Sequence, residues 1–288
     1  MTPELIADSK CATGENPLWH AAEKQLYWVD IPAGRLFRYD PATGTHEMCY
    51  ESEVVGGFTV QSDGALLLFM ARGAVRVWRE GQLRTVVTEI PAERDSRFND
   101  VIADPVGRVF CGTMSSAAHA GRLYRLENDG SLTVVLEGVG TSNGMGFTLD
   151  RRSFYHTDTR RREISLYDYD VKTGAIANRR VFVEVPEREA EGRPDGMTVD
   201  AEGCIWSARW GGGCVVRYAA DGREIGRVAL PARKVSSVAF GGPDYGDLYV
   251  TTAGAEDRNV EGAGAGALFR LRPGVRGVPE FVSRVALG

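Results

Sequence analysis

Cysteine motifs are missing from this sequence. Its five cysteines are an odd number, and no two of them stand in a Cys-x-x-Cys arrangement. A disulfide framework and a zinc ribbon are therefore not expected, and the thiols are predicted to be buried and reduced. They are Cys11, Cys49, Cys111, Cys204 and Cys214.

Long hydrophobic runs are missing too. No apolar stretch approaches the roughly 20 residues that a membrane-spanning helix needs. The first residues also lack the basic and apolar regions of a secretory signal. We therefore expect a soluble, cytoplasmic protein without a membrane partner.

Clustered positive charge is scarce. The formal net charge is −5, and no basic run is longer than Arg160-Arg-Arg162, which we expect to be a solvated turn. This balance argues against a nucleic-acid partner. Linkers and low-complexity segments are absent as well, and 288 residues with 43% hydrophobic content are enough for one large core. We predict a single domain over residues 1–288.

What the sequence does contain is a repeat. Six short apolar runs follow polar turns, and their first apolar residues are 40 to 51 positions apart, a spacing typical of solenoids and propellers. Each run is followed by a second segment of alternating apolar and polar residues, as in a half-buried strand. The six runs begin at Leu26, Leu66, Val109, Phe154, Ile205 and Leu248.

This pattern predicts an all-β, six-bladed β-propeller with four-stranded antiparallel blades. A closed ring leaves only short, protected strand edges, whereas a linear array would leave open ones. We expect the N-terminal residues 5–7 and the C-terminal residues 281–285 to meet in one shared blade. The Gly-rich and Ala-rich stretch 253–266 is predicted to be a surface loop with a role at the rim.

Four polar residues share one register of the repeat. Each precedes the first apolar residue of its run by 10 or 11 positions, and they are Glu15, Asn99, Asn143 and Asp195. Equivalent positions of the innermost strands of a propeller face the central channel, so these side chains are predicted to meet on the axis. The alternative is that Asn99-Asp100, Asn143-Gly144 and Asp195-Gly196 are ordinary turns. The shared register favours the axial interpretation.

Such a cluster would need a cation. Glu15 and Asp195 together carry two negative charges, and buried charges require pairing or coordination. An all-oxygen ligand set favours hard cations over thiolate-type zinc chemistry. Four protein ligands are fewer than the six to eight oxygens typical of Ca²⁺, which leaves positions for water or substrate.

Several motifs resemble one known family. The chain is similar over essentially its whole length to the senescence marker protein/gluconolactonase/luciferin-regenerating-enzyme group, which includes regucalcin and bacterial sugar lactonases. The motifs are Gly14-Glu15-Asn-Pro-Leu-Trp19, Arg97-Phe-Asn99-Asp100, Gly112-Thr-Met114, Ser142-Asn143-Gly144, Phe154-Tyr-His-Thr-Asp158, Arg193-Pro-Asp195-Gly-Met197 and Gly241-Gly-Pro-Asp244.

The resemblance implies a divalent-metal-dependent hydrolase that opens a sugar-derived lactone, an aldonolactone, to the aldonic acid. It implies Glu15, Asn143 and Asp195 as metal ligands, Asn99 as a further ligand, and Arg97 and Asn99 as substrate-binding residues. Asp195 would be the general base, but an Asp bound directly to a cation is a weak base, so a metal-bound hydroxide is the alternative. For the ion we expect Ca²⁺ first, with Zn²⁺, Mn²⁺, Mg²⁺ or Fe²⁺ as alternatives.

Other candidate residues are given lesser roles. His156 and Asp158 are predicted to form a structural hydrogen-bonded pair, because the chain has no Gly-x-Ser-x-Gly elbow for a nucleophilic serine. His119 lies in a segment where animal members of the family have a longer, acidic lid, and we leave it out of the catalytic set. Trp210, beside three glycines, is the best candidate for a residue at the rim.

Three other functions remain open at this point. The chain could be a calcium-binding regulatory protein without turnover, or a metal-dependent hydrolase of other esters or organophosphates. It could also be a protein-interaction platform, although the Gly-His and Trp-Asp signatures of one common propeller repeat are absent. We expect a small-molecule sugar lactone as the partner and a monomer or weak homo-oligomer.

Overall fold

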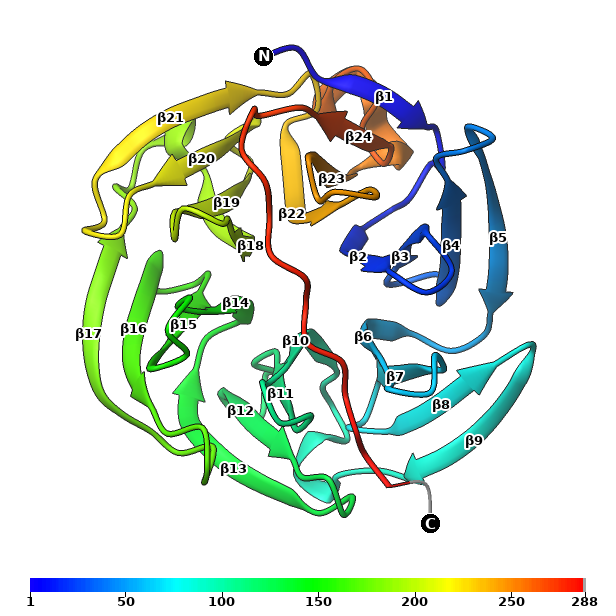
Figure 1. Ribbon diagram of the computed structural model, residues 1–288, viewed down its shortest axis with the longest axis vertical. Coiled ribbons are helices and arrows are strands. Elements are labelled where there is room, and N and C mark those ends of the chain that lie inside the picture. The colour runs from blue at the N-terminus through cyan, green and yellow to red at the C-terminus, as the bar shows by residue number, and fades with distance from the viewer. Residues whose placement is uncertain (287–288) are drawn as a thin grey trace.

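The strands are arranged as a ring around a central axis (Figure 1). The computed structural model describes residues 1–286, and residues 287 and 288, the last two of the predicted domain, lie outside the described part. Six strands lie nearest the axis, and each contacts the next around a closed circle, in the order β2, β6, β10, β14, β18 and β22. The all-β class and the propeller-like arrangement expected from the repeat are therefore observed.

Four sheets have four antiparallel strands each. The first two are β2 (Gly14–His20), β3 (Gln25–Asp30), β4 (Arg35–Asp40) and β5 (Thr45–Glu51), and β6 (Val55–Val60), β7 (Leu66–Met70), β8 (Val75–Arg79) and β9 (Gln82–Val87). The next two are β10 (Phe98–Ala103), β11 (Val109–Thr113), β12 (Gly121–Leu126) and β13 (Leu132–Val139), and β14 (Ser142–Phe147), β15 (Ser153–Asp158), β16 (Glu163–Tyr169) and β17 (Ile176–Glu184).

The remaining strands form one eight-stranded sheet, so the prediction of six separate four-stranded blades is wrong. Within residues 1–286, only four blades are discrete four-stranded sheets. The physical reason is a backbone pairing between Trp210 and Lys234, which joins β19 to β22. The strands of this sheet are β1 (Glu4–Ala7), β18 (Arg193–Val199), β19 (Ile205–Trp210), β20 (Cys214–Tyr218), β21 (Glu224–Ala229), β22 (Lys234–Gly241), β23 (Asp247–Ala253) and β24 (Leu268–Leu271).

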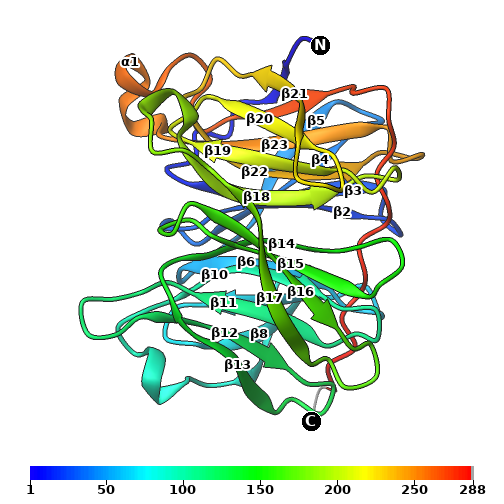
Figure 2. The same cartoon turned by 90° about the vertical axis from the view of Figure 1, so that its left-hand side faces the viewer.

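Helices are few and short among the described residues. They are the 3-10 turns η1 (Pro91–Glu93), η2 (Glu189–Glu191) and η3 (Ala255–Asp257), and the helix α1 (Arg258–Glu261). The last two belong to the 253–266 segment and project from one end of the ring (Figure 2). Within residues 1–286 there is no helix with the length and apolar character needed to cross a membrane.

Continuous apolar runs in the sequence become strands that are buried on both faces. In β7, Leu66 and Leu68 pack in one cluster with Tyr27 of β3. The alternate residue Leu67 packs in another cluster, with Val109 of β11. Because successive side chains of a strand point to opposite faces, one uninterrupted apolar run fills the space on both sides of its sheet. The core therefore lies between neighbouring sheets.

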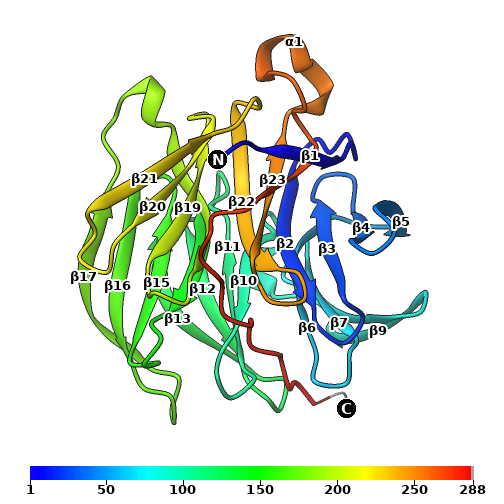
Figure 3. The same ribbon diagram turned by 45° about the horizontal axis from the view of Figure 1, so that its top comes forward.

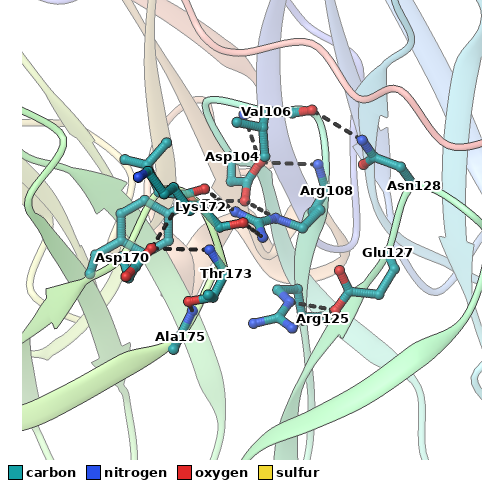
Figure 4. Close-up of polar contacts among 12 residues, drawn as sticks. Asp104, Val106, Arg108, Arg125, Glu127, Asn128, Asp170, Lys172, Thr173 and Ala175 are labelled. Atoms are coloured by element: carbon teal, nitrogen blue, oxygen red, sulfur yellow. Dashed lines mark hydrogen bonds and ion pairs between the residues drawn. The ribbon is translucent and has the colours of Figure 1, made fainter.

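A buried ion pair also connects two sheets. Asp104 Oδ2 accepts hydrogen bonds from Arg108 Nε at 2.6 Å and from the Tyr169 hydroxyl of β16 at 2.8 Å. Arg108 then donates to the backbone carbonyls of Val171 at 2.7 Å and Lys172 at 3.3 Å, as Figure 4 shows for the surrounding residues. Since both charged groups are almost fully buried, their many hydrogen bonds compensate for lost hydration.

The C-terminal segment does not pair with the N-terminus as expected. β1 pairs with β24, with Leu5 opposite Phe269. Residues 281–285 instead cross the end of the channel, where the chain runs over the centre of the ring (Figures 1 and 3). Ser283 donates to the Val60 carbonyl at 2.8 Å and accepts from the Ser62 amide at 2.8 Å. The segment thereby ties the eight-stranded sheet to the sheet of β6–β9.

The cysteines are free, as predicted. Cys11, Cys111, Cys204 and Cys214 are buried, and Cys49 is half-buried. Burial raises the pKa of the Cys11 thiol to about 12, which makes it a poor nucleophile.

Candidate active site

All five residues predicted for the site line one cavity. Glu15, Arg97, Asn99, Asn143 and Asp195 come from four different regions of the chain and surround a space of about 370 Å³. Four of them lie at or near the start of the innermost strands β2, β10, β14 and β18, and Arg97 directly precedes β10. The cavity therefore occupies the end of the channel where these strands begin.

A backbone irregularity directs these side chains to the axis. In each of the six innermost strands the pairing register shifts at this level, for example between Glu15 and Leu18 and between Asn143 and Met145. The other shifts lie at equivalent places in β6, β10, β18 and β22. A bulge bends its strand and re-aims a side chain. The repeat thus places polar side chains at one point without interrupting the strands.

The Asn-Gly and Asp-Gly dipeptides are not turns. Gly144 lies inside β14 and Gly196 inside β18, and neither has a positive φ. A Cβ at Gly144 would lie 2.5 Å from the Asp195 carbonyl oxygen, and one at Gly196 would lie 2.1 Å from Ser237 Oγ. Glycine is therefore needed because adjacent innermost strands approach each other too closely for a side chain.

The two carboxylates are buried side by side in a site with excess negative charge. Glu15 is 7% exposed and Asp195 is 4% exposed. Burial raises the pKa of Glu15 to about 8, and the nearby charge of Asp100 adds to the effect. Burial, followed by the charges of Glu15 and Asp100, raises the pKa of Asp195 well above its usual range. Arg97 opposes both shifts but does not cancel them.

Two buried oxygens at the site have no hydrogen-bond partner among the described residues. They are Asp195 Oδ1 and Asn143 Oδ1. The Asn143 amide nitrogen donates to Thr159 Oγ1 at 3.0 Å, which fixes the side chain with its oxygen unpaired. Unpaired buried polar atoms are costly and call for an explanation such as an ion. These oxygens, with the Glu15 carboxylate beside them, fit a divalent cation.

Asn99 and Arg97 are connected. Arg97 Nη1 donates to Asn99 Oδ1 at 2.8 Å and to the Phe98 carbonyl at 2.9 Å. The Asn99 amide nitrogen donates to the Ser142 carbonyl at 2.9 Å. The oxygen by which Asn99 would bind a metal is thus already engaged by Arg97, in contrast to the free oxygen of Asn143.

No group of three or more His, Cys, Asp or Glu residues within 1–286 is arranged to hold a metal ion. That result agrees with the composition of this site, in which the candidate ligands are two carboxylates and two carboxamides. Asparagine oxygens are ordinary ligands of hard cations. The fit to a cation therefore rests on the unpaired oxygens and on the excess of negative charge.

Sequence reasoning missed several residues of the site. Asp100 lines a neighbouring cavity, but its charge acts on Glu15 and Asp195, and burial raises its own pKa to about 6. Its position directly after Asn99 in the sequence was the signal that could have indicated a buried carboxylate close to the site. Arg160 and Arg193 line the cavity together with Trp210. Arg160 lies in a turn, as expected, but that turn is part of the site rather than a remote solvated surface.

The histidine predictions have mixed outcomes. His156 does not bond to Asp158 but to Ser142, with Nε2 and Oγ 2.8 Å apart. Asp158 instead accepts backbone N–H groups, including that of Gly140 at 2.9 Å. Both Ser142 and His156 are buried outside the cavity, so they do not form a hydrolytic pair. His119 also lies outside the cavity lining.

A larger cavity of about 460 Å³ lies at the opposite end of the channel, beside the C-terminal segment. It is lined mainly by apolar residues such as Met145, Phe147 and Phe281 and contains none of the predicted site residues. Chemistry rather than size distinguishes the two. Only the smaller cavity brings carboxylates, carboxamides and a guanidinium together.

Comparison with known proteins gives consistent matches along the chain. Residues 13–254 match the model of the SMP-30/Gluconolactonase/LRE-like region. The pentonolactonase XacC of Haloferax volcanii is 54% identical over 295 aligned positions, which cover 100% of both chains. A solved luciferin-regenerating enzyme superposes with a TM-score of 0.90 at 28% identity over 99% of each chain. A regucalcin of Agrobacterium tumefaciens, described as a calcium-binding protein, has a TM-score of 0.90 at 26% identity over 99% of this chain and 98% of its own.

Proposed function

Because the chain belongs to the SMP-30/gluconolactonase/LRE-like family, we propose that it is a sugar lactonase that hydrolyses an aldonolactone with the help of one divalent metal ion. The similarity to a pentonolactonase makes five-carbon lactones the first substrates to test. The observation that carries the metal dependence is the pair of unpaired oxygens, Asp195 Oδ1 and Asn143 Oδ1, in a cavity that also holds Glu15.

Glu15, Asn143 and Asp195 would hold the ion. Their two negative charges balance a divalent cation, and their oxygen donors suit Ca²⁺, Mg²⁺ or Mn²⁺, with Ca²⁺ as the first candidate and Zn²⁺ and Fe²⁺ as alternatives. When bound, the ion supplies Lewis-acid polarisation of the lactone carbonyl.

Arg97 and Asn99 would bind the substrate. Arg97 uses Nη1 for Asn99 and the Phe98 carbonyl, and a guanidinium has five N–H donors in total. The remaining donors are available to sugar hydroxyls. Because Asn99 Oδ1 already accepts from Arg97, we assign Asn99 first to substrate contact and only secondarily to the ion.

Asp195 is the proposed general base. It would take a proton from water while the water oxygen bonds to the carbonyl carbon. The ring C–O bond then breaks, and the ring oxygen takes up a proton to give the hydroxy acid. Burial raises the pKa of Asp195 and so increases its basicity, whereas a cation bound to the same carboxylate has the opposite effect. One oxygen of the Asp195 carboxylate would accept the proton, and the other would hold the ion.

The test is hydrolysis of a panel of aldonolactones by metal-stripped protein, with acid release as the readout. Ca²⁺, Mg²⁺, Mn²⁺, Zn²⁺ and Fe²⁺ are added back one at a time. Turnover that requires an ion and prefers sugar lactones supports the proposal. Hydrolysis at an equal rate without any ion would refute the metal role.

One second function is favoured by a specific observation. The regucalcin of Agrobacterium tumefaciens, at 26% identity, is described as a calcium-binding protein. A purely regulatory role for this chain would give Ca²⁺ binding without turnover of any lactone in the same panel. Turnover of organophosphates or simple esters in place of lactones would instead indicate another hydrolase.

A further inference from the structure

One tryptophan stands apart from the others in this protein. Of the five tryptophans in the sequence, Trp19, Trp28, Trp78 and Trp206 are buried. Trp210 is half-buried and lines the cavity that holds the candidate catalytic residues. It also lines an adjoining groove, which shares Arg193 with the cavity. Its indole is therefore the one that a ligand entering the cavity can contact.

The Trp210 side chain is held from one side by Lys234. The Lys234 ammonium lies over the indole ring, 5.5 Å from its centroid. The same two residues form the backbone pairing that joins β19 to β22. A cation over an aromatic face is attracted by the ring quadrupole. Because one face of the ring is covered in this way, only the other face is left for a ligand.

Lys234 is in turn held by the 253–266 segment. Its ammonium forms an ion pair with Glu261 Oε1 at 2.7 Å, and Glu261 is only 12% exposed. The Glu261 carbonyl accepts the Arg233 amide at 2.7 Å, so the backbone of the segment is fixed to the start of β22. The segment therefore acts on the cavity indirectly, through Lys234 and Trp210.

The groups beside Trp210 suit a polyhydroxylated ligand. Arg160 and Arg193 are exposed at the cavity mouth, and neither forms an ion pair with another residue in the part of the chain that the structure describes. Their guanidinium groups have several free N–H donors for hydroxyl oxygens. An indole offers a flat apolar surface for the C–H face of a sugar. Together these groups form one part of the cavity lining.

We propose that Trp210 is the substrate-contacting wall that makes the cavity prefer hydroxylated lactones over unsubstituted ones, and that Lys234 and Glu261 are positioning residues for its ring. This inference rests on the proposed lactonase function. It assigns to the 253–266 segment a role in specificity. A small lactone without substituents lacks the groups that would reach from the carboxylates to this wall.

The test compares two substrates, a pentonolactone and unsubstituted γ-butyrolactone, with wild-type protein and Trp210→Leu. For the pentonolactone we expect KM to rise about five- to tenfold with kcat changed less than twofold, as fits the loss of one aromatic contact. For γ-butyrolactone we expect no change in either constant. Trp210→Phe should retain most of the preference for the pentonolactone over γ-butyrolactone.

The positioning role is tested with Lys234→Met and Glu261→Gln. Both should raise KM for the pentonolactone about two- to threefold without changing KM for γ-butyrolactone. The conservative variant Lys234→Arg should keep the wild-type KM for the pentonolactone. Arg233→Gln is the matched control, because Arg233 is adjacent in sequence but pairs with Glu189 at 3.1 Å in the neighbouring groove. It should behave as the wild type.

Intrinsic fluorescence gives an independent readout. Since the other four tryptophans are buried, a pentonate product added to metal-loaded protein should change the emission of the wild type but not of Trp210→Leu. The inference would be overturned if Trp210→Leu raised KM equally for both lactones, or if it left the kinetic constants for both unchanged. Either result would leave the lactonase proposal intact. Absence of turnover for every lactone in wild-type protein would instead refute the lactonase proposal.

Discussion

Glu15 and Asp195 are buried carboxylates in a cavity where Arg97, the cationic group whose charge acts on both, already donates to Asn99. Neither forms an ion pair with any residue in the range 1–286. In most folds such a pair would be strongly destabilising. At the residue scale, the unbalanced charge is therefore the feature that most directly indicates a function, and two predictions follow from it.

The first concerns Asp195. Asp195→Asn keeps the size of the side chain but removes its charge and its ability to accept a proton. We expect kcat for a sugar lactone to fall by about 10²–10⁴, the range typical of a lost general base. Circular dichroism should show an unchanged fold, since asparagine and aspartate have nearly the same size and shape. Activity within twofold of the wild type would exclude Asp195 as the base.

The second concerns the pH dependence of metal binding. Without an ion, the pKa of Glu15 is raised to about 8, so below that pH its carboxyl group is mostly protonated. Metal binding requires the carboxylate and must release this proton, so affinity should rise with pH throughout the range below about 8. Calorimetry should show a gain of at least about tenfold per pH unit between 6 and 8, because one proton leaves Glu15 and the raised pKa of Asp195 adds to the effect.

Glu15→Gln serves as the control for this titration. It removes one charge and one titrating group, so affinity should be lower at every pH and its dependence on pH should be shallower. An affinity for the ion that is the same at pH 6 and pH 8 in the wild type would contradict a ligand role for Glu15.

At the element scale, the innermost strands combine two features that single residues do not explain. Each has a register shift at the level of the site. Three of them also have a glycine where the next innermost strand approaches closely, at Gly56, Gly144 and Gly196. The shift directs the preceding polar side chain inward, and the glycine lets the strands come together. The geometry of the site is therefore set by the backbones of the innermost strands.

Gly196→Ala tests this close packing. The added Cβ would lie 2.1 Å from Ser237 Oγ and 2.7 Å from Ser237 Cα, so the β22 backbone would have to move. Overpacking of this kind costs about 1–3 kcal/mol of unfolding free energy. Metal affinity should also fall, because Asp195 is the adjacent residue.

Gly226→Ala is the matched control for this prediction. Gly226 lies in β21, and a Cβ there would be 3.9 Å from its nearest neighbour, Arg217 Cβ. Denaturant unfolding should show little change for this variant. If Gly196→Ala were as stable as Gly226→Ala, the close approach of β18 and β22 would not be the reason for the glycine.

At the scale of the whole molecule, the C-terminal segment crosses one end of the channel (Figure 1), and the candidate active site lies at the other end. It bonds to loops of several sheets, including the Gly107 carbonyl, which accepts the Arg284 amide at 2.8 Å. Gln61 accepts the Val285 amide at 3.2 Å and donates to the Val285 carbonyl at 3.0 Å. The segment therefore links parts of the ring that are distant in sequence.

Removal of residues 276–288 should lower the thermal midpoint by at least about 5 °C, since the hydrogen bonds across the ring are lost. Metal affinity at 20 °C should change little, because the carboxylates lie at the other end of the channel. Gln61→Ala should shift the midpoint in the same direction by a smaller amount. An unchanged midpoint after truncation would show that the segment is not a structural link.

Local sequence patterns were enough to predict the strands, the ring and the shared register of the polar residues. Short-range alternation and a repeat of about 40 residues are local patterns, so they could be read directly, and the register of Glu15, Asn99, Asn143 and Asp195 followed from them. The resemblance to a family supplied Arg97 and the chemistry.

The division of the strands among sheets and the surroundings of the site come from contacts between segments that are distant in sequence. The pairing of Trp210 with Lys234 merges eight strands into one sheet, and the C-terminal segment crosses the channel instead of completing a blade. The position of Trp210 beside Lys234 and Glu261 depends in the same way on contacts between distant segments. These contacts leave no periodic pattern in the sequence, because they are set by how the closed ring packs.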